Sequence, residues 1–267
     1  MRRFDLFAVA SLAAAPCALF AQDGPYKVLK SARVGGEGGT DYIYANSVDR
    51  RLYITRNAVR AVAGKIPQPG TPEQTIADGK GMLYALMQDS GSVAVVDEKA
   101  MKVTKVLPLG GNTGCNGLAL DARNHVLFAA CSRTGPAGPP QPGAPPPQPT
   151  MVILSSEDGK ILTKLPLAGS SDGAVFNPAT MEAFSSGGNG TLTVVKENSP
   201  TSFEVEENLQ TMNGARTLTL DTKTGHIFVM SVERGPAPPP PPGGGRGGRG
   251  GQAPAIFGSF TILLIGK

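Results

Sequence analysis

Short runs of alternating apolar and polar residues, separated by turn-forming residues, recur along most of the chain. Five segments align on an Asp or Asn that begins a turn, and each segment continues into a second apolar run with an aromatic near its start. Alternation with a period of two, bounded by Asx-rich turns, is typical of β-hairpins. The pattern therefore predicts five copies of one hairpin, whose turns begin at Asn46, Asp78, Asp121, Asn177 and Asp221.

Two further strand-like runs follow three of these hairpins. They lie at 92–97 and 102–109, at 151–156 and 160–167, and at 191–197 and 202–210. The repeating unit is thus four short antiparallel strands in about 40 residues, the size of one propeller blade. Fewer residues separate the first two hairpins, so we expect an incomplete first blade in which 57–66 serves for two strands.

The two ends of the chain fit the closure of a ring. After the fifth hairpin only one apolar run remains, at 260–266, and a matching run lies at 26–34. Pairing these two runs in one blade would leave no open sheet edge there. We therefore predict an all-β fold, a β-propeller of four-stranded antiparallel blades with five visible hairpins. An open β-sandwich is the alternative.

The first residues predict export. A short basic start, Met1-Arg2-Arg3, leads into an apolar stretch at 6–19 that ends in small residues. This pattern is typical of a signal peptide, with cleavage after Ala21, and Pro16 interrupts the stretch too early for a membrane span. We expect a signal peptide at 1–21 and one β-propeller domain at 22–267, periplasmic or secreted and without membrane contact after cleavage.

Composition changes this picture in two places. The chain holds 35 Gly and 24 Pro, and many of them lie in two tracts, 134–150 and 235–254, that we expect to be disordered inserts of polyproline and glycine coil. The formal charge of +4 is too weak to indicate a nucleic-acid partner, although Arg246 and Arg249 stand in RGG steps. We expect a monomer.

Two cysteines remain after export, in a compartment that permits disulfides. Cys115 and Cys131 flank the third hairpin. If Asp121 faces His125 across its turn, the same register places Cys115 opposite Cys131. Cross-strand neighbours lie within disulfide reach, so we predict a bridge between them. The alternative is two buried thiols that act as small apolar residues.

One position in the repeat is polar in every copy. Five residues before each turn residue, at the start of the strand that would line the axis, stand Asp41, Glu73, Asn116, Asp172 and Arg216. A propeller gathers equivalent positions around its axis, so these side chains should form a ring at one mouth. The ring could hold a cation, a sugar or another small polar ligand. Alternatively, each polar group hydrogen-bonds its own inter-blade loop.

The repeats resemble a known family. GGEGGTDYIY, VAVVDEKAMKV, GLALDARNHVLFAAC, DGAVFNPATMEAFSS, GTLTVVKENSP and GARTLTLDTKTGHIFV are similar to the YncE-like, YVTN-repeat β-propeller proteins, over residues 26–267. The resemblance implies an exported propeller, usually of seven blades, with no established common activity. This chain departs from it in having five hairpins and a gap near 57–70.

Two function classes follow. The first is a non-enzymatic module that binds a small polar ligand or a protein partner on the ring face, without a cofactor. The second is a metal-dependent hydrolase of the gluconolactonase or lactonase type, whose divalent ion, such as Ca²⁺, would be held by Asp41, Glu73, Asp172 and Asn116. We favour the first, because the family resemblance is not to such hydrolases. We predict no catalytic residue: both histidines, His125 and His226, lie in hairpin turns away from the ring.

Overall fold

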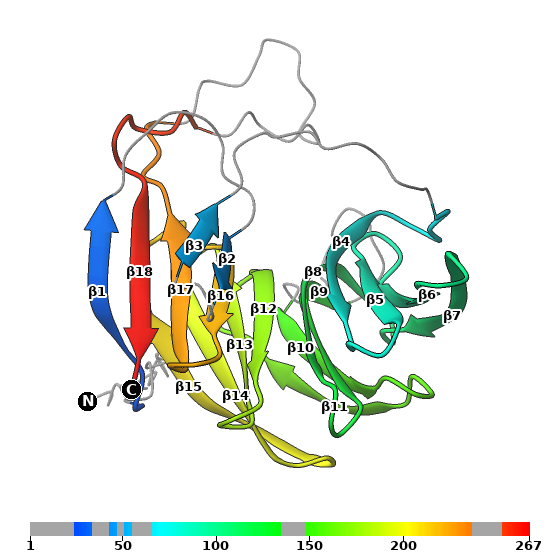
Figure 1. The fold of residues 1–267 in the computed structure, drawn as a ribbon. Coiled ribbons are helices and arrows are strands. Elements are labelled where there is room, and N and C mark those ends of the chain that lie inside the picture. Colours follow the sequence, from blue (N-terminus) through cyan, green and yellow to red (C-terminus); the bar gives the residue numbers. More distant parts are fainter. Residues whose placement is uncertain (1–23, 34–42, 47–50, 55–65, 135–147, 237–252) are drawn as a thin grey trace, which may run out of the picture.

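The computed structural model describes residues 24–33, 43–46, 51–54, 66–134, 148–236 and 253–267. Within them the regular structure consists of β-strands (Figure 1). Their bounds are β1 (Lys27–Arg33), β2 (Ile43–Asn46), β3 (Arg51–Ile54), β4 (Pro72–Ala77), β5 (Met82–Met87), β6 (Ser92–Asp97), β7 (Lys102–Pro108), β8 (Asn112–Asp121), β9 (Val126–Thr134), β10 (Thr150–Ser155), β11 (Ile161–Pro166), β12 (Ser171–Asn177), β13 (Glu182–Gly187), β14 (Thr191–Ser199), β15 (Ser202–Gln210), β16 (Leu218–Asp221), β17 (His226–Ser231) and β18 (Thr261–Gly266). In this part of the chain, no helix is long and apolar enough to cross a membrane.

The strands form separate antiparallel sheets that correspond to the predicted blades. Blade 1 is the pair β2-β3, and blades 2, 3 and 4 have the strand orders β4-β5-β6-β7, β8-β9-β10-β11 and β12-β13-β14-β15. Blade 5 has the order β16-β17-β18-β1. The fold is therefore a β-propeller of four-stranded blades with a two-stranded first sheet, as the sequence predicted. The segment expected to complete blade 1 lies almost entirely outside the described residues.

The first strand of each blade lies innermost. Strand β4 contacts β8, β8 contacts β12, β12 contacts β16, and β16 contacts β2. Blade 5, the last along the chain, thus lies next to blade 1, the first. The inner strands therefore surround a common axis, and equivalent residues of neighbouring blades face the same region.

Blade 5 joins the two ends of the domain, as predicted. Strand β1 pairs with β18 from Lys27 opposite Gly266 to Arg33 opposite Thr261, and Figure 1 shows the two strands side by side. Every residue of β1 is exposed, so its own side chains bury little apolar surface against the domain. The backbone ladder and the anchors at its two ends hold this strand in place.

A buried carboxylate anchors the start of β1. The Glu182 side chain, fully buried in blade 4, accepts hydrogen bonds from the Tyr26 hydroxyl and, at 2.8 Å, from Lys267 Nζ. Burial alone would raise the pKa of Glu182, but the hydrogen bonds, that from Lys267 first, outweigh it and hold the pKa below its usual range. The Tyr26 backbone N–H also donates to Glu207 Oε2, at 3.0 Å. These contacts tie the residue before β1 and the residue after β18 to blade 4.

The Asx residues predicted to begin the hairpin turns do so through one recurrent hydrogen bond. In each of the four turns whose side chains are described, the side-chain Oδ1 accepts from the backbone N–H two residues later, as an Asx-turn requires. The bonds run to Asp78 from Lys80 (2.7 Å), to Asp121 from Arg123 (2.9 Å), to Asn177 from Ala179 (3.0 Å) and to Asp221 from Lys223 (3.1 Å). The turn chemistry is thus encoded locally in each repeat.

The hydrophobic core lies between neighbouring blades. One cluster joins blades 2 and 3 through Leu86, Leu118 and Leu127. Two further clusters, around the fully buried rings of Phe128 and Phe184, join blade 3 to blade 4 and blade 4 to blade 5. Strands inside a blade, such as β6 (SVAVVD) and β10 (TMVILS), bury nearly every side chain and are almost continuous apolar runs, whereas the outer strand β7 is mostly exposed.

The predicted register of the third hairpin is wrong at its turn. Asp121 pairs with Val126, not with His125, and the offset continues to Gly117 opposite Ala130. A β-bulge between Cys115 and Gly117 then absorbs one residue and brings Cys115 opposite Cys131. A bulge places two residues of one strand opposite one residue of its partner. Asn116 is the additional residue here.

Candidate functional site

The candidate ring positions coincide with β-bulges in the inner strands. The register shifts between Pro72 and Thr75 in β4, between Cys115 and Gly117 in β8, and between Ser171 and Gly173 in β12. The residues within these shifts include three of the predicted positions, Glu73, Asn116 and Asp172. Bulges are common where a strand re-aims a side chain at a functional site.

Blade 5 has the same arrangement just before β16. The Arg216 N–H donates to the Met230 carbonyl, and the Met230 N–H donates to the Thr217 carbonyl, each at 3.0 Å. Arg216 and Thr217 therefore lie opposite one residue of β17, as in a bulge. The fifth predicted position, Asp41, lies outside the described residues.

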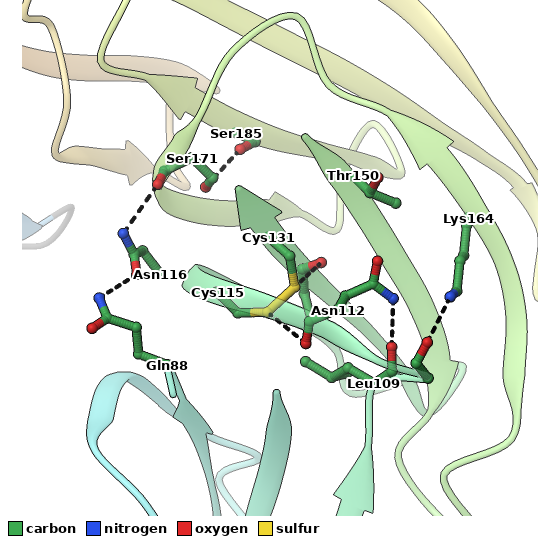
Figure 2. The surroundings of a disulfide bond; sticks show 12 residues. Gln88, Leu109, Asn112, Cys115, Asn116, Cys131, Thr150, Lys164, Ser171 and Ser185 are labelled. Carbon is green, nitrogen blue, oxygen red and sulfur yellow. Dashed lines mark hydrogen bonds between the residues drawn. A yellow bond between two sulfur atoms is a disulfide. The ribbon is translucent and has the colours of Figure 1, made fainter. Parts of the chain in front are cut away.

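Glu73 and Asn116 are linked across the boundary between blades 2 and 3. The Gln88 carboxamide, just after β5, donates to Glu73 Oε1 at 2.8 Å and to Asn116 Oδ1 at 2.7 Å. Asn116 Nδ2 in turn donates to the Ser171 carbonyl of blade 4, at 3.3 Å. Figure 2 shows the connected side chains of Gln88 and Asn116 reaching Ser171. The chain of hydrogen bonds thus spans three blades.

Asp172 and Arg216 are linked across the next boundary, between blades 4 and 5. Arg216 Nη1 lies 3.8 Å from Asp172 Oδ1, and the Thr217 hydroxyl is 3.4 Å from Asp172 Oδ2. The Arg216 side chain is 52% exposed and that of Asp172 is 30% exposed, so both are open to a ligand. The arginine extends over Gly188, where an added Cβ would lie 3.2 Å from its Nε.

The four described ring residues therefore form two linked pairs, not one cluster. Glu73 and Asn116 share Gln88, whereas Asp172 faces Arg216, and the Ser171 carbonyl connects the two pairs. Two carboxylates and one guanidinium give the described ring a formal charge of −1. Such a surface offers a polar ligand two negatively charged hydrogen-bond acceptors and one positively charged donor.

One residue deeper, Gln74 joins three inner strands. Its Oε1 accepts from the backbone N–H groups of Leu118 (2.9 Å) and Ala174 (3.0 Å), and its Nε2 donates to the Ala174 carbonyl (2.8 Å). At the equivalent positions of blades 3 and 4 stand Gly117 and Gly173. A Cβ on Gly117 would lie 2.7 Å from the Gly173 carbonyl carbon. Gln74 therefore forms a floor beneath the polar ring.

The sequence interpretation missed Gln74 and Gln88. The signal for Gln74 was present, because the residue after each ring position is Gly in blades 3 and 4 but Gln in blade 2. A long amide side chain in one blade, with glycine at the equivalent position of the next two blades, indicates that the amide fills the space left by the missing side chains. Gln88 carries no such signal, since it follows the second strand of its hairpin and reaches the ring only through the blade geometry.

The disulfide lies directly beneath the Asn116 bulge. Cys115 and Cys131 are fully buried and bonded to each other, and they join β8 to β9 (Figure 2). Because the bond lies beside the additional residue, it fixes the register on which the position of Asn116 depends.

Both Gly- and Pro-rich tracts begin on the ring side of their blades. Thr134, at the end of β9, pairs with Asn112 at the start of β8, so the first tract begins near Asn116. The structure places Thr134 and Thr150 within strands, and 135–147 lies outside the described residues. The second tract follows β17, on the side where Arg216 precedes β16. A β-bridge joins Arg234 to Ala255 at its base, and 237–252 lies outside the described residues.

In the described part of the chain, neither histidine lies near the ring and no group of metal-ligating side chains forms there. His125 lies in the turn after β8, with Nδ1 4.0 Å from Glu157 Oε1, and His226 is the first residue of β17. Among the described residues, no three His, Cys, Asp or Glu side chains are grouped so that they could hold a metal ion.

Comparison with known proteins identifies a fold but no family. No protein-family model and no curated protein sequence matches the chain. Among solved structures, the chain is similar to hydrazine synthase of Kuenenia stuttgartiensis, with a TM-score of 0.50, 13% identity, and coverage of 68% of this chain and 47% of that one. It is also similar to the WD40 domain of Neurospora crassa Pan2 (TM-score 0.48, 11% identity, 80% and 55% covered). A third match is the β-propeller domain of Myceliophteria thermophila Cps50, or Swd1 (0.45, 14%, 63% and 64%). The chain spans about half to two thirds of these proteins.

Proposed function

We propose that the chain is an exported, non-enzymatic β-propeller that binds a polar ligand or a protein partner on the face formed by the inner-strand bulges. The observation that carries the proposal is the recurrence of the bulge. The strand is irregular at one equivalent position in four blades, and each time a polar side chain stands there, as is common where bulges re-aim side chains beside a binding site.

The partners of the two carboxylates favour recognition over metal chemistry. A hydrolase of the lactonase type would need Glu73, Asp172 and Asn116 to converge on one divalent ion, together with Asp41. Instead, Glu73 accepts from Gln88, and Asp172 lies beside Arg216. Carboxylates engaged in this way are suited to exchange hydrogen bonds with a ligand that carries hydroxyl, amine or carboxylate groups.

Export and family are part of the same proposal. The buried Cys115–Cys131 disulfide supports export, because such bonds persist mainly in oxidising compartments. The basic and apolar residues at 1–21 supply the corresponding leader. Membership of the YVTN-repeat propellers rests on the repeat sequences, and the strand order within the blades supports the propeller fold alone.

Thermal unfolding with a panel of small molecules tests the proposal. The probes are monosaccharides, free amino acids, dicarboxylates, Ca²⁺, Zn²⁺ and a chelator. A compound that binds the ring and is present at a concentration of about 100 times its Kd should stabilise the folded protein by about 2.7 kcal/mol. This corresponds to a rise in Tm of about 5–10 °C for a domain of this size.

Matched variants locate the effect. Arg216→Gln should abolish the rise in Tm, whereas Arg123→Gln, which removes an exposed arginine from the hairpin turn after β8, should leave it intact. A rise that survives Arg216→Gln would contradict the ring as the site. Stabilisation by a divalent ion, reversed by the chelator, would instead favour the hydrolase.

A further inference from the structure

Two apolar side chains on the ring side of blade 5 lie in solvent. Phe257 is 78% exposed and Ile256 is 48% exposed, which makes them the two most exposed large apolar residues of the described chain. They lie in the segment that enters β18, where Phe260, three residues later, is only 6% exposed. The same short segment thus buries one phenylalanine and presents the other. Large apolar groups exposed next to one another are characteristic of interaction sites.

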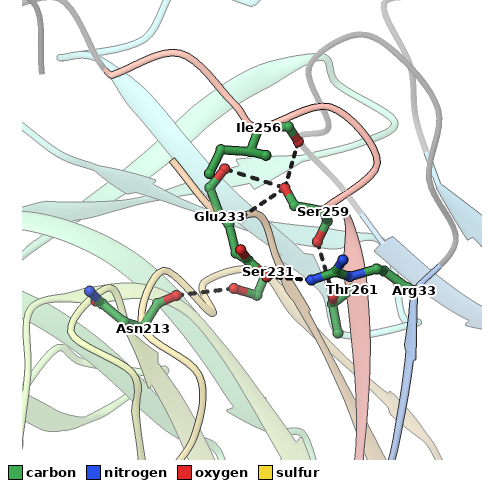
Figure 3. Close-up of polar contacts among 7 residues, drawn as sticks. All are labelled: Arg33, Asn213, Ser231, Glu233, Ile256, Ser259 and Thr261. Atoms are coloured by element: carbon green, nitrogen blue, oxygen red, sulfur yellow. Dashed lines mark hydrogen bonds and ion pairs between the residues drawn. The ribbon is translucent and has the colours of Figure 1, made fainter. Parts of the chain in front are cut away.

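Hydrogen bonds fix the segment that carries these two residues. The Ile256 N–H donates to the Glu233 carbonyl at 2.8 Å, and the Gly235 N–H donates to the Pro254 carbonyl at 2.9 Å. The Ser259 hydroxyl donates to the Ile256 carbonyl at 2.7 Å and accepts from the Glu233 N–H at 3.1 Å. Figure 3 shows Ser259 between Ile256 and Glu233.

The backbone conformation also helps to hold Phe257 in its exposed position. Gly258 has a φ of +74°, which a residue with a side chain rarely adopts, and it turns the chain between the exposed Phe257 and the buried Ser259. An aromatic residue held on an ordered turn loses little conformational entropy when a partner covers it. Aromatic residues, phenylalanine among them, are enriched in the cores of protein interfaces.

The charges around this turn indicate the charge of a complementary partner. Arg33 Nη2 and Glu233 Oε1 are 2.7 Å apart and neutralise each other. Arg234 Nη1 donates to the Ala253 carbonyl, at 3.0 Å, and a carbonyl carries no formal charge. The surface made by Ile256, Phe257, Arg33, Glu233 and Arg234, here called the Phe257 surface, therefore has a net charge of +1.

We propose that the Phe257 surface docks an extended segment of a partner protein, in which an apolar anchor stands next to an aspartate or glutamate. The anchor covers Phe257 and Ile256, and the carboxylate pairs with Arg234. The inference rests on the proposed binding function and assigns a protein partner to a separate surface on blade 5. It uses none of the ring residues, so its failure and the failure of the ring site are separable.

A library of random linear peptides displayed on phage is the probe, selected on the whole chain. Enriched peptides should share an apolar residue beside an acidic one. Their affinity, measured by fluorescence anisotropy, should fall at least about tenfold in Phe257→Ser, as expected for the loss of a central aromatic. The affinity should be unchanged in Val106→Ser, which removes from strand β7 an apolar side chain about as exposed (47%) as Ile256.

Two further variants separate the alternatives. Arg234→Gln should weaken binding several-fold and reduce its dependence on salt, because one ion pair is lost. Arg216→Gln should leave peptide affinity unchanged. Three results would overturn the proposal: no enrichment over an empty support, equal affinity for Phe257→Ser, or a concentration-dependent dimer that Phe257→Ser abolishes. The last would show that a second copy of this chain occupies the surface.

Discussion

Replacing Gln74 by Ala should destabilise the propeller more than any other single change to a polar side chain on the ring side. The substitution removes the acceptor of the Leu118 and Ala174 N–H groups and the donor to the Ala174 carbonyl. Leu118 and Ala174 are themselves fully buried. An unsatisfied buried polar group costs about 1–3 kcal/mol. Because Gln74 is only partly buried and water can replace some of its bonds, we expect a loss of about 3 kcal/mol.

Urea unfolding followed by far-UV circular dichroism measures this loss, since the chain has no Trp to report by fluorescence. Gln210→Ala is the matched control. Gln210 lies at the end of the outer strand β15 and only donates, to the Gly190 carbonyl at 2.7 Å and to that of Thr211. The control should cost less than about 1 kcal/mol.

Gln74→Glu isolates the acceptor role. It keeps an oxygen for the two N–H groups but loses the donor and adds a negative charge beside Glu73, so we expect a loss between those of Gln74→Ala and the control. A Gln74→Ala variant within about 0.5 kcal/mol of the original chain would refute the inference that this side chain joins blades 2, 3 and 4.

Three further predictions concern stability. Burial raises the pKa of Glu197 to about 7 from its ordinary value of 4.5, and the nearby Asp121 adds to the effect, while a hydrogen bond from Asn124 opposes it. The folded state therefore keeps a proton that the unfolded chain releases, and the free energy of unfolding should fall by up to about 3 kcal/mol as the pH rises from 4.5 to 7. Glu197→Gln should remove that fall from urea titrations at several pH values; an unchanged pH profile would contradict the assignment. The Cys115–Cys131 bond closes a separation of 16 residues, so Cys115→Ala with Cys131→Ala should cost about 3 kcal/mol and lower the Tm. An equal Tm for this variant and the original chain would contradict a stabilising Cys115–Cys131 disulfide. Tyr26→Phe removes one donor to the buried Glu182 and should cost about 1–2 kcal/mol. Hydrogen exchange should then quicken at the β1 and β18 amides and remain unchanged in blade 3; uniform quickening would argue against a local anchor.

Much of the architecture could be predicted because it is encoded locally and repeated. Each Asx-turn is specified by one residue and its neighbours, as at Asp78 and Asp221. The same local pattern occurs five times in the sequence, so each copy supports the prediction of the others. The closure by β1 and β18 followed from counting strands, because an unpaired run at each end of the chain had one available partner. Both predictions needed only the order of residues along the chain.

The details of the candidate site could not be predicted, because they depend on where the blades bring residues together. The bulge at Asn116 shifts the register by one residue, and no local pattern marks it. Gln88 joins Glu73 to Asn116 only once blades 2 and 3 are packed against each other. The ligand role of the ring stays a prediction, and Asp41 lies outside the described residues.

A double-mutant cycle between Glu73 and Asn116 tests most directly whether equivalent positions of neighbouring blades meet around one axis. The two residues lie far apart in the sequence and on different blades, but both accept hydrogen bonds from Gln88. Glu73→Ala, Asn116→Ala and the double variant should give a coupling free energy of about 0.5–1.5 kcal/mol in urea unfolding. Additivity within about 0.3 kcal/mol would contradict the shared ring.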